Sequence, residues 1–257
     1  ALREQLILPK GKHTTILVAI SGGKDSAVLL ERIHENLSKR RDVTIVGGCV
    51  DEGIDGYRPP SLECARKLCE DLNIQFETVS YPELGFKEMD QVVDKITELN
   101  ERKAPCSYCG VFRRQGINHL AERVGADVIA LGHNLDDMAQ TIMMNMQNGD
   151  LERTLRLAPH TSTPIEGMIP RIVPLRWIPE QEIHLYALHK GLPIHHEECP
   201  HGDGALRFRH RETVAMMEAD VPGTRHGLLR MADDVKKLHS MSSGKFNTAK
   251  PINCPQC

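Results

Sequence analysis

The chain has 257 residues, a formal net charge of -3 and 40% hydrophobic residues. This length suits one large α/β domain, or one domain with small appendages, and the composition is sufficient for a buried core. The charge argues against a protein that binds nucleic acid by overall charge, while a local basic face stays compatible with it. No apolar run reaches the length of a membrane span and no secretion signal is recognisable, so we expect a cytoplasmic protein without membrane partners.

The residues around 15–33 predict a buried strand, a tight turn and a helix in succession. Residues 15–20 form an apolar, β-branched run, and Ser-Gly-Gly-Lys-Asp-Ser follows at 21–26. The first turn of a helix presents free backbone N–H groups and a positive dipole end. Two glycines allow close backbone approach and a lysine adds charge. We therefore expect a phosphate site, with an ordinary strand-to-helix turn as the alternative.

Strands and helices alternate through most of the remaining chain. Further strands are expected at 43–50, 74–79, 128–131, 172–175 and 192–194. Helices are expected at 59–72, at 180–190 and at 223–243. Three others are expected to end before Gly125, to end at Met146 and to begin at about residue 207. Residues 83–102 look irregular and 150–176 look loop-like. The alternation predicts an α/β fold with a doubly wound parallel sheet, whose carboxyl strand ends face the ligand.

Acidic residues follow the strand expected at 128–131. Gly132, Asp136 and Asp137 lie directly after it, at the same sheet edge as the phosphate loop. Carboxylates beside a polyphosphate commonly hold Mg²⁺ through oxygen ligands. The alternative is helix capping by Asn134 or Asp136, with acidic residues favoured in the first turn by the dipole. Both roles are compatible with the pattern.

Eight cysteines in a chain without a secretion signal indicate metal or redox chemistry more than disulfides. Three of them, Cys49, Cys64 and Cys69, fall in an expected strand or helix and are interpreted as small buried hydrophobic residues. The others are two C-x-x-C pairs and a loop cysteine, namely Cys106 with Cys109, Cys254 with Cys257, and Cys199.

The group formed by Cys106, Cys109 and Cys199 allows three interpretations. Three thiolates would leave one iron of an iron–sulfur cluster without a protein ligand. A zinc site needs a fourth ligand, for which His201 is near in sequence. Cys106 and Cys199 could also form a redox pair without metal. Spacing alone does not separate these possibilities.

Four motifs taken together resemble a known family. They are Ser-Gly-Gly-Lys-Asp-Ser at 21–26, Pro-Cys-Ser-Tyr-Cys-Gly-Val-Phe-Arg-Arg at 105–114, Gly-His-Asn-Leu-Asp-Asp-Met-Ala-Gln-Thr at 132–141 and Glu-Cys-Pro at 198–200. The first resembles the PP-loop of the ATP pyrophosphatases. The set resembles the TtcA/TtuA superfamily of tRNA 2-thiolation enzymes, and its second motif is most similar to the archaeal NcsA and eukaryotic cytosolic type. The similarity runs from about residue 14 to 240.

The resemblance implies an ATP-dependent tRNA sulfurtransferase with Mg²⁺ and an iron–sulfur cluster, expected to be 4Fe-4S. It implies that ATP contacts Ala19, Ser21, Gly22, Gly23, Lys24, Asp25, Ser26, Arg113, Gly132 and Asp137. It places the cluster on Cys106, Cys109 and Cys199, and the catalytic residues are Lys24, Asp137, Cys106 and Cys199. Relatives also suggest a homodimer.

The implied reaction transfers AMP to the C2 oxygen of a uridine, and a sulfur nucleophile then displaces the AMP. Phosphate-loop donors, a lysine and Mg²⁺ would stabilise the phosphate charge. The sulfur could be a hydrosulfide on iron or a persulfide on Cys106 or Cys199, supplied by sulfide, a persulfide or a ubiquitin-like carrier. The target base must leave its stack. Basic residues expected to contact RNA phosphates are Arg171, Arg176, Arg207, Arg209 and Arg211.

The wobble uridine of the anticodon is the expected target, with the T-loop uridine or an anticodon-loop cytidine as alternatives. A non-thiolating PP-loop ligase, or a non-catalytic metal-containing RNA-binding module, would explain fewer motifs. We expect a lead-in segment at 1–13, a catalytic domain at 14–243 and a linker with half of a finger at 244–257. Relatives often have further zinc-finger pairs, so Cys254 and Cys257 are expected to form a partial zinc site in a chain lacking residues at both ends.

Overall fold

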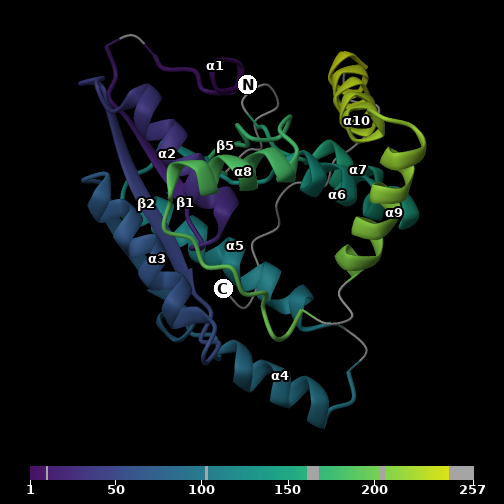
Figure 1. Cartoon of the computed structure of the whole chain (residues 1–257), viewed down its shortest axis with the longest axis horizontal. Helices are drawn as coiled ribbons and strands as arrows, with labels where there is room; N and C mark the ends of the chain where they lie inside the picture. Colours follow the sequence, from purple (N-terminus) through teal and green to yellow (C-terminus); the bar gives the residue numbers. More distant parts are fainter. Residues whose placement is uncertain (10, 102–103, 161–167, 203–205, 243–257) are drawn as a thin grey trace.

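The computed structural model describes residues 1–9, 11–101, 104–160, 168–202 and 206–242. In these residues the chain forms a five-stranded parallel sheet with the strand order β3-β2-β1-β4-β5 (Figure 1). The strands are β1 (Thr14–Ala19), β2 (Val43–Asp51), β3 (Gln75–Ser80), β4 (Val128–Ala130) and β5 (Arg171–Ile172). The predicted doubly wound parallel sheet is confirmed.

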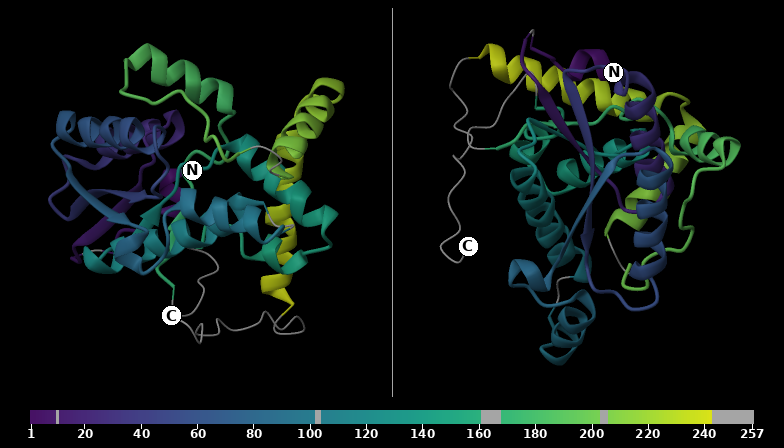
Figure 2. Two further views of the ribbon diagram at one scale, coloured as in Figure 1. Left: turned by 90° about the horizontal axis from the view of Figure 1, so that it is seen from below. Right: turned by 90° about the vertical axis from the view of Figure 1, so that its left-hand side faces the viewer.

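Helices cover both faces of the sheet, as the two views of Figure 2 show. One face packs against α2 (Lys24–Leu37), α3 (Arg58–Asp71) and α8 (Glu180–Lys190). The other face packs against α4 (Met89–Glu98) and α5 (Pro105–Arg123). Side chains of β1 alternate between these two cores: Ile16 and Val18 enter the first, and Leu17 enters the second. A strand that is buried on both faces therefore has a continuous apolar sequence.

Four helices form a separate lobe beside the sheet. They are α6 (Leu135–Gln147), α7 (Leu151–Leu155), α9 (Leu206–Asp220) and α10 (Thr224–Met241). Leu135 and Ile142 of α6 pack against Leu229 of α10, and all three are fully buried. Because α6 begins directly after β4, this lobe is attached to the carboxyl edge of the sheet.

The topology places a ligand crevice beside β1. From β1 the chain proceeds to β2 and β3 on one side of the sheet, and it returns to β4 and β5 on the other side. Loops after β1 and β4 consequently diverge, and open α/β sheets bind ligands at such a switch point. No helix in the described ranges has the length and apolar character that crossing a membrane requires.

The structure differs from the sequence expectations at several short elements. Residues 192–194 lie in a loop, and the expected strand there is wrong. A helix, α7, occupies part of the region expected to be a loop, and a short 3-10 helix η1 (Pro82–Leu84) precedes α4. The amino-terminal residues contain the one-turn helix α1 (Leu2–Gln5). Cys254 and Cys257, with the rest of the expected finger, lie outside the described residues.

The fifth strand is shorter than expected, and a side chain pairs with the residue that follows it. The amide of Gln5 accepts a hydrogen bond from Val173 N at 2.7 Å and donates one to Val173 O at 3.3 Å. Gln5 and Val173 are almost completely buried. One side chain thus replaces a neighbouring strand and satisfies two buried backbone groups.

We expect Gln5→Leu to lower the free energy of unfolding by about 2 kcal/mol, because two buried backbone groups lose their partners. Urea denaturation followed by circular dichroism measures this loss. The control is Glu4→Ala on the same helix, where the side chain is 77% exposed and the change should stay within about 0.5 kcal/mol. A Gln5 variant as stable as the control would contradict the edge-pairing role.

Candidate active site

The loop after β1 has the shape of an anion-binding turn. Gly22 has a φ of 88°, and a Cβ placed there would lie 2.0 Å from the carbonyl oxygen of Ser61 on α3. The helix α2 begins at Lys24 without a side-chain cap on Gly23. Ser26 Oγ accepts a hydrogen bond from Ser21 N at 3.1 Å and donates one to Gly23 O at 2.9 Å. Hydrogen bonds that involve Ser26 therefore stabilise the loop, and the N–H groups of the first helical turn can bind an anion.

Lys24 lies between two carboxylates at the start of α2. Its Nζ is 2.7 Å from Glu180 Oε1 and 3.0 Å from Asp25 Oδ2. Burial alone would lower the pKa of Lys24, but the hydrogen bond to Glu180 and the charge of Asp25 raise it overall. Lys24 therefore stays cationic, as phosphate binding requires. Burial raises the pKa of Asp25, although Lys24 and a hydrogen bond from Asn134 oppose the shift.

The residues after β4 approach the phosphate loop closely. A Cβ on Gly132 would lie 3.1 Å from Ser26 N. Asn134 caps α6 by accepting from Asp137 N at 2.9 Å, and Asp137 completes the capping box. Asn134 Nδ2 also donates to Asp25 Oδ1 at 2.9 Å. The expected capping role is confirmed, with Asn134 as the cap, and a role in metal binding stays a prediction.

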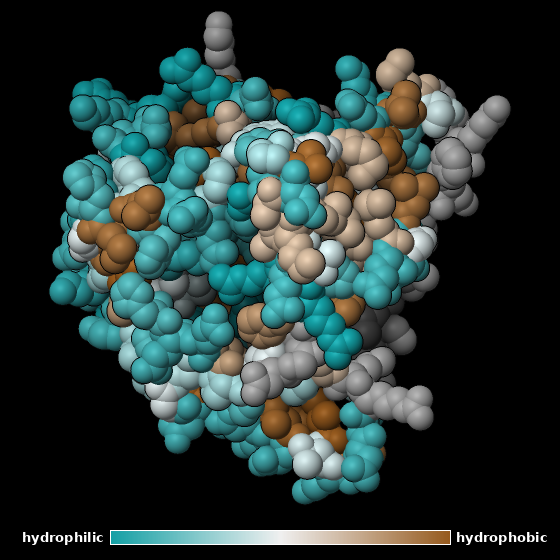
Figure 3. Space-filling view, turned by 45° about the vertical axis from the view of Figure 1, so that its right-hand side comes forward, coloured by the Kyte–Doolittle hydropathy of each residue, from teal (hydrophilic) through white to brown (hydrophobic). Residues whose placement is uncertain are grey.

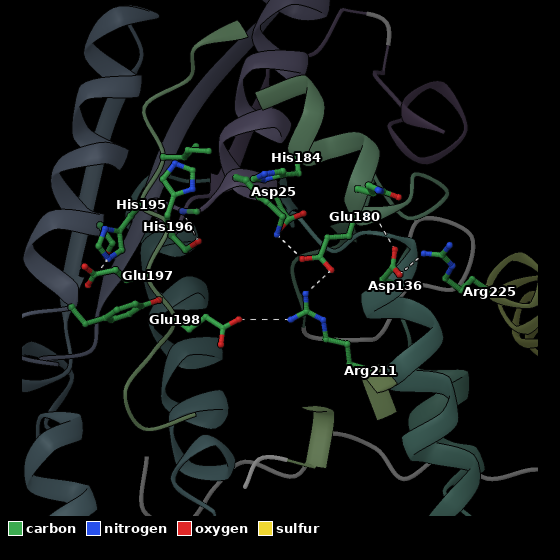
Figure 4. A pocket seen from close by; sticks show the side chains of 17 residues that line it. Asp25, Asp136, Glu180, His184, His195, His196, Glu197, Glu198, Arg211 and Arg225 are labelled. Carbon is green, nitrogen blue, oxygen red and sulfur yellow. Dashed lines mark hydrogen bonds and ion pairs between the residues drawn. The ribbon is translucent and has the colours of Figure 1, made fainter. Parts of the chain in front are cut away.

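A cavity of about 570 Å³ opens in front of the phosphate loop (Figure 4). Its walls come from the phosphate loop, α3, α6, α8, the segment 194–198, α9 and α10. Figure 4 shows Asp25, Glu180 and Arg211 meeting on one side of it, with His195 and Glu197 on the other. Polar and charged side chains dominate this lining, as expected for a charged and strongly polar ligand.

Three arginines of the helical lobe face the carboxylates around this cavity. Arg207 Nη1 is 3.0 Å from Asp137 Oδ1, and Arg225 Nη1 is 2.5 Å from Asp136 Oδ1. Arg211 lies 3.6 Å from Glu180 and 3.8 Å from Glu198. An anionic ligand in the cavity would compete with the carboxylates for these cations.

The three predicted cysteines approach one another beside the same edge of the sheet. Cys106 and Cys109 lie in the first turns of α5, and Cys199 lies in the loop that follows α8. All three are free thiols, and Cys106 Sγ contacts His201 O at 3.8 Å. Burial and the charges of the other two cysteines raise the pKa of Cys199, whereas the His201 N–H lowers it. The cysteine pair thus comes from a helix and Cys199 from a loop.

Hydrogen-bond donors surround Cys109 in particular. The hydroxyl of Tyr81, which is fully buried, lies 3.3 Å from Cys109 Sγ, and Arg113 Nη2 donates to the same sulfur at 3.5 Å. The backbone carbonyl of His201 contacts Cys106 Sγ, and its ring Nε2 contacts Asp90 Oδ1 at 2.6 Å. A zinc site completed by His201 stays a prediction.

Several residues that were predicted to contact ATP or RNA do not line the cavity. Arg113 is paired with Glu52 at 2.9 Å and contacts Cys109, so the structure places it on the thiol side of the cavity and not in the cavity wall. Arg176 is buried and paired with Asp233 at 2.6 Å, which is incompatible with the expected RNA contact. Arg171 donates to Asn118 at 2.9 Å and is partly buried. Arg209 and Arg211 are exposed, and Ala19 ends β1 below the loop.

Several site residues were not among the predicted ones. Glu180, Arg225 and Tyr57 line the cavity, and Glu52 and Arg58 lie buried behind the phosphate loop. Of these, Glu52 had a sequence signal, because the turn Asp51-Glu52-Gly53 follows the second strand at the edge that is expected to face the ligand. The others lie far from any glycine-rich or cysteine motif, and only tertiary packing brings them to the site.

The fold and the phosphate loop define an α/β protein that binds nucleotide phosphates at the first strand-to-helix turn. A family model described as PP-loop domain matches residues 2–215. The tRNA 2-thiolation protein NcsA of Haloferax volcanii is 38% identical over 269 residues, which cover 100% of this chain and 82% of that protein. The cytoplasmic tRNA 2-thiolation protein 1 of Aspergillus niger is 34% identical and is covered over 69% of its length.

A solved structure agrees with these relatives. The U34-tRNA thiolase NcsA from Methanococcus maripaludis with its 4Fe-4S cluster superposes with a TM-score of 0.77 and 31% identity, covering 88% of this chain and 73% of that one. The chain thus belongs to the PP-loop family, in the group that includes the NcsA and cytoplasmic tRNA 2-thiolation proteins. The resemblance inferred from the four motifs is confirmed.

We expect Gly22→Ala to raise the Kd for ATP at least about thirtyfold, because a Cβ 2.0 Å from backbone must displace the loop. Titration with ATP followed by calorimetry measures the change. The matched control is Gly125→Ala, where φ is 61° and no atom lies within 4 Å of the added Cβ. The control should cost about 1 kcal/mol of stability and leave ATP binding unchanged. Normal ATP binding by a folded Gly22 variant would show that this loop does not bind phosphate.

Proposed function

We propose that the chain catalyses ATP-dependent 2-thiolation of a uridine in tRNA, with the wobble uridine of the anticodon as the target. One observation supports this most strongly: the segment that contains Cys199 is tied to the phosphate loop. His195 N donates to Gly22 O at 2.8 Å, four residues before the cysteine. Tyr57 lines the cavity, and the charge of Cys199 raises the pKa of Tyr57, after burial as the larger cause. The phosphate site and the thiols therefore adjoin.

The first half of the reaction uses the phosphate loop. The C2 oxygen of the uridine attacks the α-phosphorus of ATP, the bond to the β-phosphate breaks, and pyrophosphate leaves. The backbone N–H groups of the loop and Lys24 lie where negative charge increases on the phosphates. Asp25, Asp136 and Asp137 are oxygen ligands of the kind that Mg²⁺ prefers, so they are the proposed holders of the ion that accompanies ATP.

The second half needs sulfur at the same uridine. A hydrosulfide equivalent attacks C2, the bond to the AMP oxygen breaks, and AMP leaves a base in which sulfur replaces oxygen. The sulfur donor is proposed to be sulfide, a ubiquitin-like carrier, or a persulfide. With a persulfide, the outer sulfur bonds to C2 and a second thiol then forms a disulfide with the inner sulfur, which breaks the S–S bond to the base. Arg207, Arg209 and Arg211 lie on α9, which contributes Arg211 to the cavity wall, and they are proposed to contact tRNA phosphates.

The three thiols have the donor chemistry of an iron–sulfur cluster. Cysteine thiolates hold such clusters, with one thiolate on each iron. Cys106, Cys109 and Cys199 are the proposed ligands of a 4Fe-4S cluster. When bound, such a cluster supplies one iron that has no protein ligand and can bind sulfur.

The proposed catalytic unit comprises residues 14–243, with 1–13 as a lead-in segment and 244–257 as a linker and partial finger. A homodimer and a cytoplasmic location stay part of the proposal.

The face drawn in Figure 3 is mostly hydrophilic, with hydrophobic residues in separate patches. Exposed apolar side chains on α9 and α10 include Met216, Leu238 and Met241.

The test uses protein purified without oxygen and tRNA that lacks thiolation. We expect one AMP and one pyrophosphate per 2-thiouridine formed. AMP and pyrophosphate are measured in the reaction mixture, and 2-thiouridine is measured in the separated tRNA by nuclease digestion and mass spectrometry. Cys199→Ser should lose iron and lower thiolation at least about a hundredfold, a barrier increase of about 2.7 kcal/mol, while ATP still binds. The control is Cys64→Ser on α3, a free cysteine in the helix that lies outside the thiol group.

A tRNA with cytidine in place of the wobble uridine should accept no sulfur. Sulfur incorporation into that tRNA would move the target to another nucleotide. Thiolation that survives replacement of all three cysteines would remove them from the reaction. ATP cleavage without any thiolated product, on every tRNA tested, would favour a different PP-loop ligase.

A further inference from the structure

A single buried carboxylate lies between the phosphate loop and the thiols. Glu52 directly follows β2, is 3% exposed, and is paired with two arginines. Its Oε2 lies 2.8 Å from Arg58 Nε, and its Oε1 lies 2.9 Å from Arg113 Nε. A buried carboxylate is costly unless it is paired, and here each oxygen faces a different cation.

The first arginine connects Glu52 to the phosphate loop. Arg58 is also 3% exposed, and its Nη1 donates to Ser21 O at 2.9 Å and to Ser61 Oγ at 3.2 Å. Its other nitrogen donates to Val50 O and contacts Cys49 Sγ at 2.8 Å. Arg58 thus joins the end of β2, the first turn of α3 and the backbone of the loop. Glu52 is the carboxylate that faces its Nε.

The second arginine connects Glu52 to the thiols. Arg113 comes from α5, and its Nη2 reaches Cys109 Sγ at 3.5 Å while its Nε pairs with Glu52. The side chain of Arg113 is 52% exposed, in contrast to Arg58. An exposed arginine has many rotamers, and pairing with a fixed carboxylate selects one of them. Glu52 therefore determines which way Arg113 points.

Glu52 is one carboxylate shared by two cations. Cys49 adds no further anion, because burial raises the pKa of that thiol to about 11. Asp51, the residue before Glu52, is a second carboxylate beside the group, and its Oδ1 accepts from Gly53 N at 3.0 Å. A single ion pair needs only one arginine, whereas Glu52 pairs with one arginine at the phosphate loop and another at the thiols.

We propose that Glu52 is a positioning residue that couples the two halves of the site by holding Arg58 on the phosphate loop and Arg113 on Cys109. The inference rests on the proposed function only in assuming that both sites serve one reaction. Removing Arg113 should leave the carboxylate of Glu52 to Arg58 alone. Removing Glu52 should leave two arginines without their shared anion. Either change is expected to alter phosphate binding.

The experiment is a double-mutant cycle on ATP binding, measured by calorimetry on the full chain purified without oxygen. We expect Glu52→Gln to raise the Kd about tenfold and Arg113→Met about threefold. The double variant should also show about a tenfold increase, and not the thirtyfold expected of independent effects, because Arg113 acts through Glu52. Unfolding midpoints confirm that each variant is folded.

A thirtyfold increase in the double variant would overturn the proposal, since Arg113 would then act on ATP directly. An unchanged Kd in Glu52→Gln would overturn it as well. If Glu52→Gln does not fold, Glu52→Asp replaces it, because the shorter side chain keeps the charge and reaches only one arginine. The effects of Glu52→Asp and Arg113→Met on the Kd must then be non-additive in the same way. The control is Asp233→Asn, which removes the carboxylate from buried Arg176 and should change the Kd less than about twofold.

The cycle separates this inference from the proposed function. ATP binding requires neither tRNA nor sulfur transfer, so the coupling can hold in a chain that thiolates nothing. Conversely, thiolation with additive effects in the cycle would keep the proposed function and remove only the role of Glu52.

Discussion

The close contact between the phosphate loop and α3 is the constraint on which the site depends. Gly22 lies against the carbonyl of Ser61 so tightly that a Cβ would overlap it, and Arg58 binds the carbonyl of Ser21 from behind. These contacts fix the back of the loop, so its N–H groups face the cavity. Because α3 follows β2, the loop after β1 is shaped by the neighbouring strand as much as by its own sequence.

Charge is balanced locally around the cavity. Lys24 pairs with Asp25 and Glu180, and the arginines of α9 and α10 pair with carboxylates of α6 and α8. Such pairs hold the helical lobe against the sheet while they keep both signs of charge beside the phosphate loop. A polyphosphate with a divalent cation presents both signs as well, so it can exchange partners with these pairs. The lobe therefore has a direct electrostatic link to nucleotide binding.

The thiol group combines two segments that are distant in sequence. The first turns of α5 supply Cys106 and Cys109, and the loop after α8 supplies Cys199. The loop is fixed by the hydrogen bond from His195 N to Gly22 O, and α5 is fixed by its core residues beneath the sheet. Two side chains contact the sulfur of Cys109: Tyr81, which is buried, and Arg113, which is paired with buried Glu52.

The sequence by itself determined the parallel sheet, the phosphate loop and the three cysteines, because strand periodicity, glycines and C-x-x-C spacing are local patterns. It also located α8 to the residue, since apolar spacing and the glycine after it are local signals. Tertiary structure alone decided that residues 192–194 leave the sheet, that Arg176 is buried and that Arg113 faces a thiol. It also placed Glu52 between two arginines from α3 and α5. These outcomes depend on pairings between residues that are distant in sequence, such as Arg176 with Asp233 and Glu52 with Arg113, and no local pattern records which distant partner a polar side chain will find.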